Sequence, residues 1–103
     1  MEYKIYTLSD PETLNVRYVG VTSHSLSNRL SGHIHDAKTK FSHKCNWIKS
    51  LLAKGLKPLI QELESCTESE WEDLEIYWIE QFRQWNFHLV NADKGGKGVI
   101  KIN

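Results

Sequence analysis

Five side chains far apart in the sequence are of the types that handle phosphate esters. The phenols of Tyr6 and Tyr18 can donate or accept hydrogen bonds. Arg29 carries a planar fork of donors that matches a phosphate, and His33 can hydrogen-bond or move a proton near neutral pH. Glu75 supplies a carboxylate, the ligand type that Mg²⁺ and Mn²⁺ prefer. These types suit metal-assisted hydrolysis of a phosphate ester, provided that the fold brings them together.

The spacing of these residues indicates both function and simpler roles. Arg29 and His33 are four residues apart in a predicted helix, so they share a face beside its apolar stripe. Glu75 lies within the apolar stripe of a later helix, where a carboxylate is costly unless it is paired or bound to a metal. A buried salt bridge from Glu75 to Arg29 or Arg83 would account for it equally well. A half-exposed polar flank would account for Arg29 and His33.

Alternating and helical apolar spacing predicts the elements that must position these side chains. We expect strands at 3–8, 15–21 and 58–63, helices at 25–38 and 42–55, a long helix opened by a capping box at 67–70, and a glycine-rich turn at 91–98. The first two strands should form a hairpin that places Tyr6 and Tyr18 on one face. The order β-β-α-α-β-α predicts a single α+β domain over residues 1–103, with a three-stranded antiparallel sheet flanked by helices.

The charges of the chain are unevenly distributed. Thirteen basic and thirteen acidic residues cancel, and a net charge of zero by itself argues against a nucleic-acid partner. However, nine bases and four acids precede Pro58, whereas four bases and nine acids follow Lys57. The two parts therefore carry +5 and −5. We predict that basic side chains on and between the first two helices contact a nucleic-acid backbone, namely His35, Lys38, Lys40, His43 and Lys44.

Other features of the sequence concern the compartment of the protein. The N-terminus has no signal-peptide pattern, and no apolar run reaches the roughly 20 residues of a membrane helix. Cys45 and Cys66 form no CxxC pair, which favours a reduced protein without a zinc knuckle. We therefore expect a cytoplasmic protein that does not contact membranes.

Several short motifs occur in a fixed order along nearly the whole chain, from about Tyr3 to Gly98. They are Lys4-Ile5-Tyr6, Tyr18-Val19-Gly20, the R-x-x-x-H run from Arg29 to His33, Glu75 followed by Trp78-Ile79, and Asn91 before a glycine pair. In this order the chain resembles the GIY-YIG nuclease family. It departs from the family where Lys4 replaces the first glycine of the first motif and Val19 replaces isoleucine in the second.

The resemblance implies a role for each matching residue. Glu75 would hold Mg²⁺ or Mn²⁺, and Arg29 would bind the scissile phosphate. Tyr6 would orient or deprotonate the attacking water, and Tyr18 and His33 would hydrogen-bond the water, Tyr6 or the phosphate. Some members also use a histidine or lysine near the start of the second helix. Asn91 would support the loop near the carboxylate.

The expected function is that of a standalone, metal-dependent endonuclease that nicks DNA or cuts both strands. The resemblance leaves RNA open as a substrate, as it does a homodimer or a partner subunit, and it favours a bacterial or phage-encoded protein. Two alternatives remain at this point: a degenerate module that binds nucleic acid without cutting it, and an interaction domain with a buried Arg-Glu pair. Retention of Arg29 and Glu75 favours the enzyme.

Overall fold

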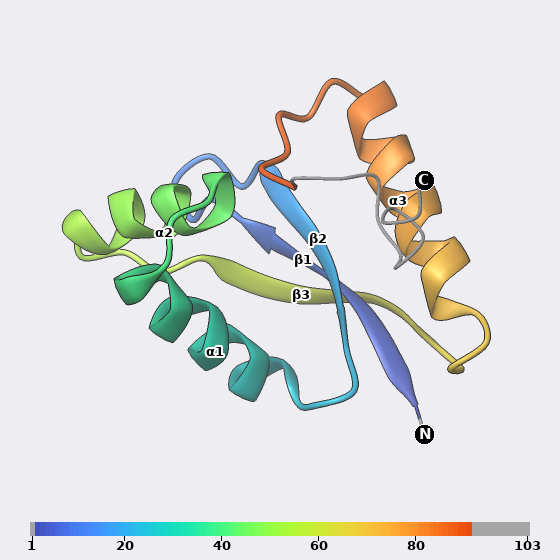
Figure 1. Cartoon of the computed structure of the whole chain (residues 1–103). Helices are drawn as coiled ribbons and strands as arrows, with labels where there is room; N and C mark the ends of the chain where they lie inside the picture. The colour runs from blue at the N-terminus through green and yellow to red at the C-terminus, as the bar shows by residue number, and fades with distance from the viewer. Residues whose placement is uncertain (1, 92–103) are drawn as a thin grey trace.

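The computed structural model of the chain describes residues 2–91 and has the predicted order β-β-α-α-β-α. Strands β1 (Tyr3–Ser9), β2 (Val16–Thr22) and β3 (Leu59–Cys66) form an antiparallel sheet in the order β2-β1-β3. Helices α1 (Leu26–Thr39) and α2 (His43–Ala53) cover one face of this sheet, and α3 (Trp71–Gln84) covers the other (Figure 1). The α+β class and the three-stranded antiparallel sheet are thus confirmed.

Short polar residues and one glycine set the ends of the early elements. The Asp10 carboxylate accepts the backbone N–H of Glu12 at 2.7 Å, which forms the tight turn of the β1-β2 hairpin. Ser25 and Ser42 cap α1 and α2 by accepting backbone N–H groups through their hydroxyls. Gly55 takes a φ of 76° after α2, a conformation that glycine adopts without the steric cost of a side chain. These features are local, so the sequence predicts them well.

Two boundaries differ from the sequence-based prediction. The third strand continues past Leu63 to Cys66, because pairing with β1 carries it through polar residues that have weak strand propensity. The capping box forms in part, since the Glu70 carboxylate accepts the Thr67 N–H at 2.9 Å. The regular helix α3 nevertheless begins only at Trp71.

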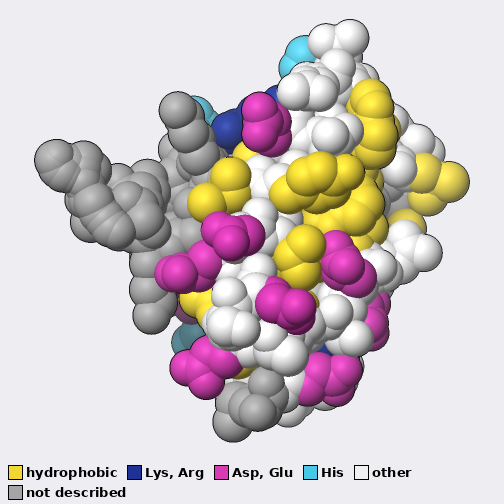
Figure 2. All heavy atoms as spheres, turned by 90° about the vertical axis from the view of Figure 1, so that its right-hand side faces the viewer, with side chains coloured by type: hydrophobic (Ala, Val, Ile, Leu, Met, Phe, Trp, Pro, Cys, Tyr) yellow, Lys and Arg dark blue, Asp and Glu magenta, His cyan; other side chains and the backbone are white. Residues whose placement is uncertain are grey.

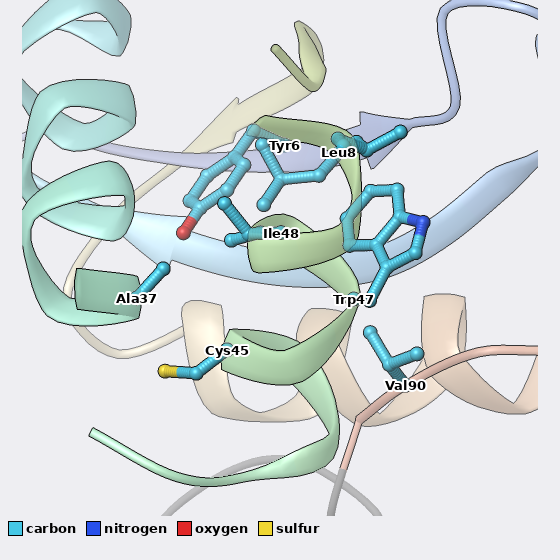
Figure 3. Close-up of a cluster of buried hydrophobic side chains, with 8 residues drawn as sticks. Tyr6, Leu8, Ala37, Cys45, Trp47, Ile48 and Val90 are labelled. Atoms are coloured by element: carbon cyan, nitrogen blue, oxygen red, sulfur yellow. The ribbon is translucent and has the colours of Figure 1, made fainter. Parts of the chain in front are cut away.

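The sheet separates two buried clusters. One lies against α1 and α2, and Figure 3 shows its side chains converging from several elements; its buried members are Tyr6, Leu8, Ala37, Cys45, Trp47, Ile48, Leu51 and Val90. The other lies under α3 and contains Ile5, Val19, Cys66, Ile79 and Phe82. Tyr6 and Ile5 therefore face opposite layers, as strand alternation predicts. Both cysteines are buried and free.

The outer face of α3 is acidic and partly apolar. Figure 2 shows this side of the molecule, where acidic side chains surround an exposed apolar patch. Ile76, Tyr77 and Trp85 are exposed hydrophobic side chains. Within residues 2–91, no helix has the length and apolar character needed to cross a membrane. Apart from Asn91, the predicted glycine-rich turn at 91–98 lies outside the described residues.

Candidate functional site

Tyr6 is the centre of the candidate site. It lies on the central strand β1 opposite Gly20 of β2, and its side chain is fully buried. Its hydroxyl oxygen lies 2.6 Å from Nε2 of His33 and accepts Nε of Arg29 at 3.2 Å. The packing of α1 on the sheet thus brings together three of the residues that sequence analysis singled out, although 27 positions separate Tyr6 from His33.

Two hydrogen bonds hold the Tyr6 hydroxyl. Burial, together with the positive charges of Lys44 and Arg29, lowers the pKa of His33 to about 3, so the ring is neutral at pH 7. Arg29 can only donate, so the phenol accepts from it. The phenol donates its proton to Nε2 of His33 in the tautomer that carries the ring proton on Nδ1, and accepts from Nε2 in the other tautomer. The buried Nδ1 has no partner in the described part of the chain.

The environment of Tyr6 favours the protonated phenol. Burial raises the pKa of Tyr6, and the negative charge of Glu75 raises it further. The positive charge and hydrogen bond of Arg29 act in the opposite direction but do not outweigh burial. Tyr6 is therefore a neutral phenol at pH 7 in this state. It would act as a base only when it can pass its own proton to a neighbour.

Gly20 provides the space in which the two phenols meet. A Cβ atom at this position would lie 2.5 Å from the Tyr6 hydroxyl oxygen and 2.8 Å from Cε2 of Tyr18. The Tyr18 ring packs edge-on against His33, with 5.3 Å between centroids, and its centroid is 6.4 Å from that of Tyr6. Glycine at position 20 is thus explained by steric contact. The prediction that both tyrosines share a face is confirmed.

Arg29 and Lys44 form the accessible, positively charged side of the cluster. Both side chains are half-buried, and the Lys44 ammonium lies 5.2 Å from the centroid of the Tyr18 ring. Burial, helped by the positive charges of Arg29 and Lys40, lowers the pKa of Lys44. Lys44 is thus the basic residue at the start of α2 that faces the cluster, whereas His43 is exposed. Sequence spacing alone left that choice open.

Glu75 approaches the cluster from the other layer of the fold. It is half-buried on α3, and its charge acts on the Tyr6 phenol. No group of three or more His, Cys, Asp or Glu side chains that could hold a metal occurs in residues 2–91. A single carboxylate is nonetheless chemically suited to Mg²⁺, which often takes one or two protein ligands and fills its other positions with water and substrate phosphate. The donor chemistry at Glu75 therefore fits such an ion.

Asn91 ties the segment after α3 to the edge strand β2. Its side-chain amide accepts the backbone N–H of Val19 at 3.0 Å and donates to the Val19 carbonyl at 2.8 Å. The Asn91 carbonyl in turn accepts Nη2 of Arg83 at 3.2 Å. The amide thus satisfies backbone groups of β2 between Tyr18 and Gly20, and its structural role is to hold this edge in place.

The predicted nucleic-acid contacts lie on the side of the molecule formed by α1 and α2. His35, Lys38, Lys40 and His43 are exposed, and Lys40 forms a surface ion pair with Asp36 at 3.4 Å. The sheet separates this side from α3, whose outer face carries acidic side chains (Figures 1 and 2). The contact of these basic residues with nucleic acid stays a prediction.

Arg17 is a further cation at this edge that sequence analysis did not single out. Leu8 pairs with Tyr18 and Ser9 pairs with Val16, so Arg17 is the extra residue of a β-bulge. Its guanidinium lies 5.4 Å from the Trp47 ring centroid. A bulge depends on how two strands pair, and no local sequence signal marks this one.

Comparisons of the chain with family models, with curated proteins and with solved structures give no match. The family resemblance of the motifs therefore stays an expectation. The function must be inferred from the residues themselves.

Proposed function

We propose that this protein is a divalent-metal-dependent endonuclease of the GIY-YIG type that hydrolyses phosphodiester bonds of DNA. The observation that carries the proposal is the contact of Arg29 and His33 with the Tyr6 hydroxyl, at 3.2 and 2.6 Å. A buried tyrosine held by a basic and a proton-accepting side chain is an unusual use of a core position. It supports a proton-handling role better than a purely packing role.

Arg29 is the residue that we propose binds the scissile phosphate. Its Nε is fixed by Tyr6, and the guanidinium makes no other hydrogen bond within residues 2–91. A fork held in this way meets a phosphate without losing much side-chain freedom, and it stabilises the charge that develops on the phosphoryl oxygens. Arg29 is half-buried, so its charge is only partly screened by solvent.

Tyr6 and His33 would form a proton relay behind Arg29. Water would attack phosphorus, and the bond from phosphorus to the 3′ oxygen would break. The 3′ oxygen would leave with the bonding electron pair and take a proton from a solvent water, which gives products with a 5′-phosphate and a 3′-hydroxyl. As Tyr6 takes a proton from the water, it passes its own proton to Nε2 of His33. Burial is the main cause that lowers the pKa of His33 to about 3, and the positive charges of Lys44 and Arg29 lower it further. An arriving phosphate would offset the part that comes from these charges.

Access to this relay is an important condition of the mechanism. Tyr6 and His33 have no exposed surface, whereas Tyr18 and Arg29 are half-buried. The water must therefore reach the Tyr6 oxygen past Arg29 and Tyr18, and the Tyr18 hydroxyl would hydrogen-bond it. This arrangement would shield the relay from bulk water until substrate is bound.

Glu75 is the residue that would hold Mg²⁺ or Mn²⁺. When bound, such an ion polarises the phosphate and stabilises the leaving 3′ oxygen. The exposed bases on α1 and α2 would hold the phosphate backbone without reading its sequence. With a net charge of zero, the chain should bind DNA weakly on its own, and a second copy or another subunit would then strengthen binding.

Relaxation of supercoiled plasmid tests this proposal. The wild-type protein should nick the plasmid with Mg²⁺ or Mn²⁺ and not with a chelator. Arg29→Ala and Glu75→Ala should be inactive while Lys57→Gln, which removes an exposed charge far from the cluster, cuts normally. A wild-type protein that leaves every plasmid form intact with both metals overturns the proposal for generic DNA. Mutants that cut as well as the wild type overturn the assignment of the site.

A further inference from the structure

A second positively charged site lies at the edge of β2, beside the candidate active site. A cavity of about 500 Å³ opens there between β2, the start of α2 and the segment that follows α3. Figure 1 shows this segment running back from α3 to the start of β2 near α2. The residues that line the cavity are Arg17, His43, His88, Leu89, Val90 and Asn91. No carboxylate occurs among these described lining residues.

Arg17 is held firmly in this cavity. The bulge in β2 turns its guanidinium onto the Trp47 ring, at 5.4 Å from the centroid. Its Nε donates to the His88 carbonyl at 2.7 Å, and its own carbonyl accepts the Val90 N–H at 2.6 Å. The terminal nitrogens of Arg17 make no hydrogen bond within residues 2–91. A stacked and anchored guanidinium with unused donors is the arrangement that recognises phosphate oxygens.

The cavity and the candidate active site share one stretch of chain. Arg17 precedes Tyr18 in β2, and His43 precedes Lys44, whose ammonium lies over the Tyr18 ring. Asn91 lines the cavity and holds the backbone of Val19. A strand whose phosphate lies on Arg29 would have its next phosphates available to Lys44 and Arg17, because one strand carries a phosphate about every 3.4 Å along the helix axis.

We infer that this cavity binds a phosphodiester of the same nucleic-acid strand, a short distance from the scissile one. This inference rests on the proposed function. Arg17 would be its principal ligand, with His43 and His88 as additional donors. Because the cavity presents the positive charge of Arg17 to an anionic group, the contact would position the strand without selecting its sequence.

Binding of a short labelled DNA duplex, measured by fluorescence anisotropy in chelator at several salt concentrations, tests the inference without cleavage. Arg17→Gln should weaken binding about tenfold and lower the salt dependence by about one ion. The matched control is Lys57→Gln, which removes one exposed charge elsewhere and should change neither quantity. His43→Gln combined with His88→Gln changes only exposed side chains and should weaken binding without affecting folding. Unchanged affinity and salt dependence in both cavity variants would overturn the inference.

A free phosphate group is the other source of the same chemistry. Inorganic phosphate, compared with chloride at equal ionic strength, should compete with DNA only weakly, and less for Arg17→Gln than for the wild type. Equal competition for the two proteins contradicts the assignment of the cavity to phosphate. Saturation of the wild-type cavity by inorganic phosphate at concentrations far below those that release DNA contradicts the assignment to a strand.

Plasmid nicking by the same variants separates the two proposals. Arg17→Gln should raise KM and leave kcat nearly unchanged, since it does not touch the reacting atoms. If the wild type cuts and Arg17→Gln has normal KM and normal binding, the cavity assignment fails alone. If the wild type never cuts but Arg17→Gln binds DNA less tightly, the nuclease proposal fails alone.

Discussion

Replacement of Gly20 by alanine should displace both phenols of the candidate site. The new Cβ would lie 2.5 Å from the Tyr6 hydroxyl, 2.6 Å from Cζ of Tyr6 and 2.8 Å from Cε2 of Tyr18. Contacts this short force the rings apart, and overpacking of a core costs about 1–3 kcal/mol. Displacement of the hydroxyl would also weaken its bond to His33, worth about 1 kcal/mol. Alanine restricts the unfolded chain by about 0.5–1 kcal/mol more than glycine does, which offsets only part of this loss.

Gly32→Ala is the matched control for this substitution. Apart from the two neighbouring residues and the backbone of α1 itself, a Cβ at position 32 would meet Nη1 of Arg29 at 3.5 Å, an ordinary van der Waals contact, and no other atom of residues 2–91 within 4 Å. Alanine should therefore stabilise α1 by up to about 1 kcal/mol. Alanine should thus lower the free energy of unfolding at position 20 and raise it at position 32. The two variants should differ in this free energy by about 2–3 kcal/mol.

Urea unfolding followed by tryptophan fluorescence measures this difference, because the chain contains four tryptophans. The midpoint for Gly20→Ala should fall and that for Gly32→Ala should rise, with unchanged slopes. If Gly20→Ala is as stable as the wild type, the phenols do not meet over Gly20 and the geometry of the site is wrong.

Three other variants test the charges and hydrogen bonds of the protein. Tyr6→Phe should lower the free energy of unfolding by about 1–3 kcal/mol, because it leaves Nε2 of His33 and Nε of Arg29 without their hydrogen-bond partner. Tyr77→Phe, at an exposed position, should leave the free energy of unfolding unchanged. Equal effects of the two substitutions in urea unfolding would contradict this prediction. The pKa of His33 is about 3 in the folded protein, so only the unfolded chain binds this proton between about pH 6.5 and pH 3. Stability should fall as the pH is lowered through that window, by up to about 5 kcal/mol. His33→Gln should remove this part of the pH dependence, and identical pH profiles for the two proteins would argue against a buried neutral ring. Lys38→Gln combined with Lys40→Gln should lower the salt dependence of DNA binding by about two ions in anisotropy titrations. Thermal unfolding of this variant should be unchanged. An unaltered salt dependence would exclude these lysines from the DNA interface.

The sequence predicts those features of the fold that depend on neighbouring residues. Ser25, Ser42 and Gly55 mark helix ends through bonds and backbone angles that they make locally. Strand alternation likewise places Tyr6 and Tyr18 on one face, because the two strands are joined by a short turn. These predictions need no knowledge of how distant segments pack.

Other features depend on contacts between distant segments, and sequence analysis did not find them. Helical spacing places His33 beside the apolar stripe, but only packing against Tyr6 and Tyr18 shows that it is fully buried and uncharged. The bulge that turns Arg17 toward Trp47 follows from a shift in strand register, which leaves no mark on the local pattern. Burial of these groups is what determines their proton affinity and charge.

The rate of plasmid nicking by Arg29→Lys, relative to the wild type, tests most directly the claim that Tyr6 positions a phosphate-binding guanidinium. Lysine keeps the charge but loses both the fork and the Nε that bonds to Tyr6. With Mg²⁺ or Mn²⁺ at saturating plasmid, we expect a loss of about 100-fold or more in rate, with metal-dependent products that carry 5′-phosphate ends. A lysine variant that nicks at the wild-type rate would contradict the claim.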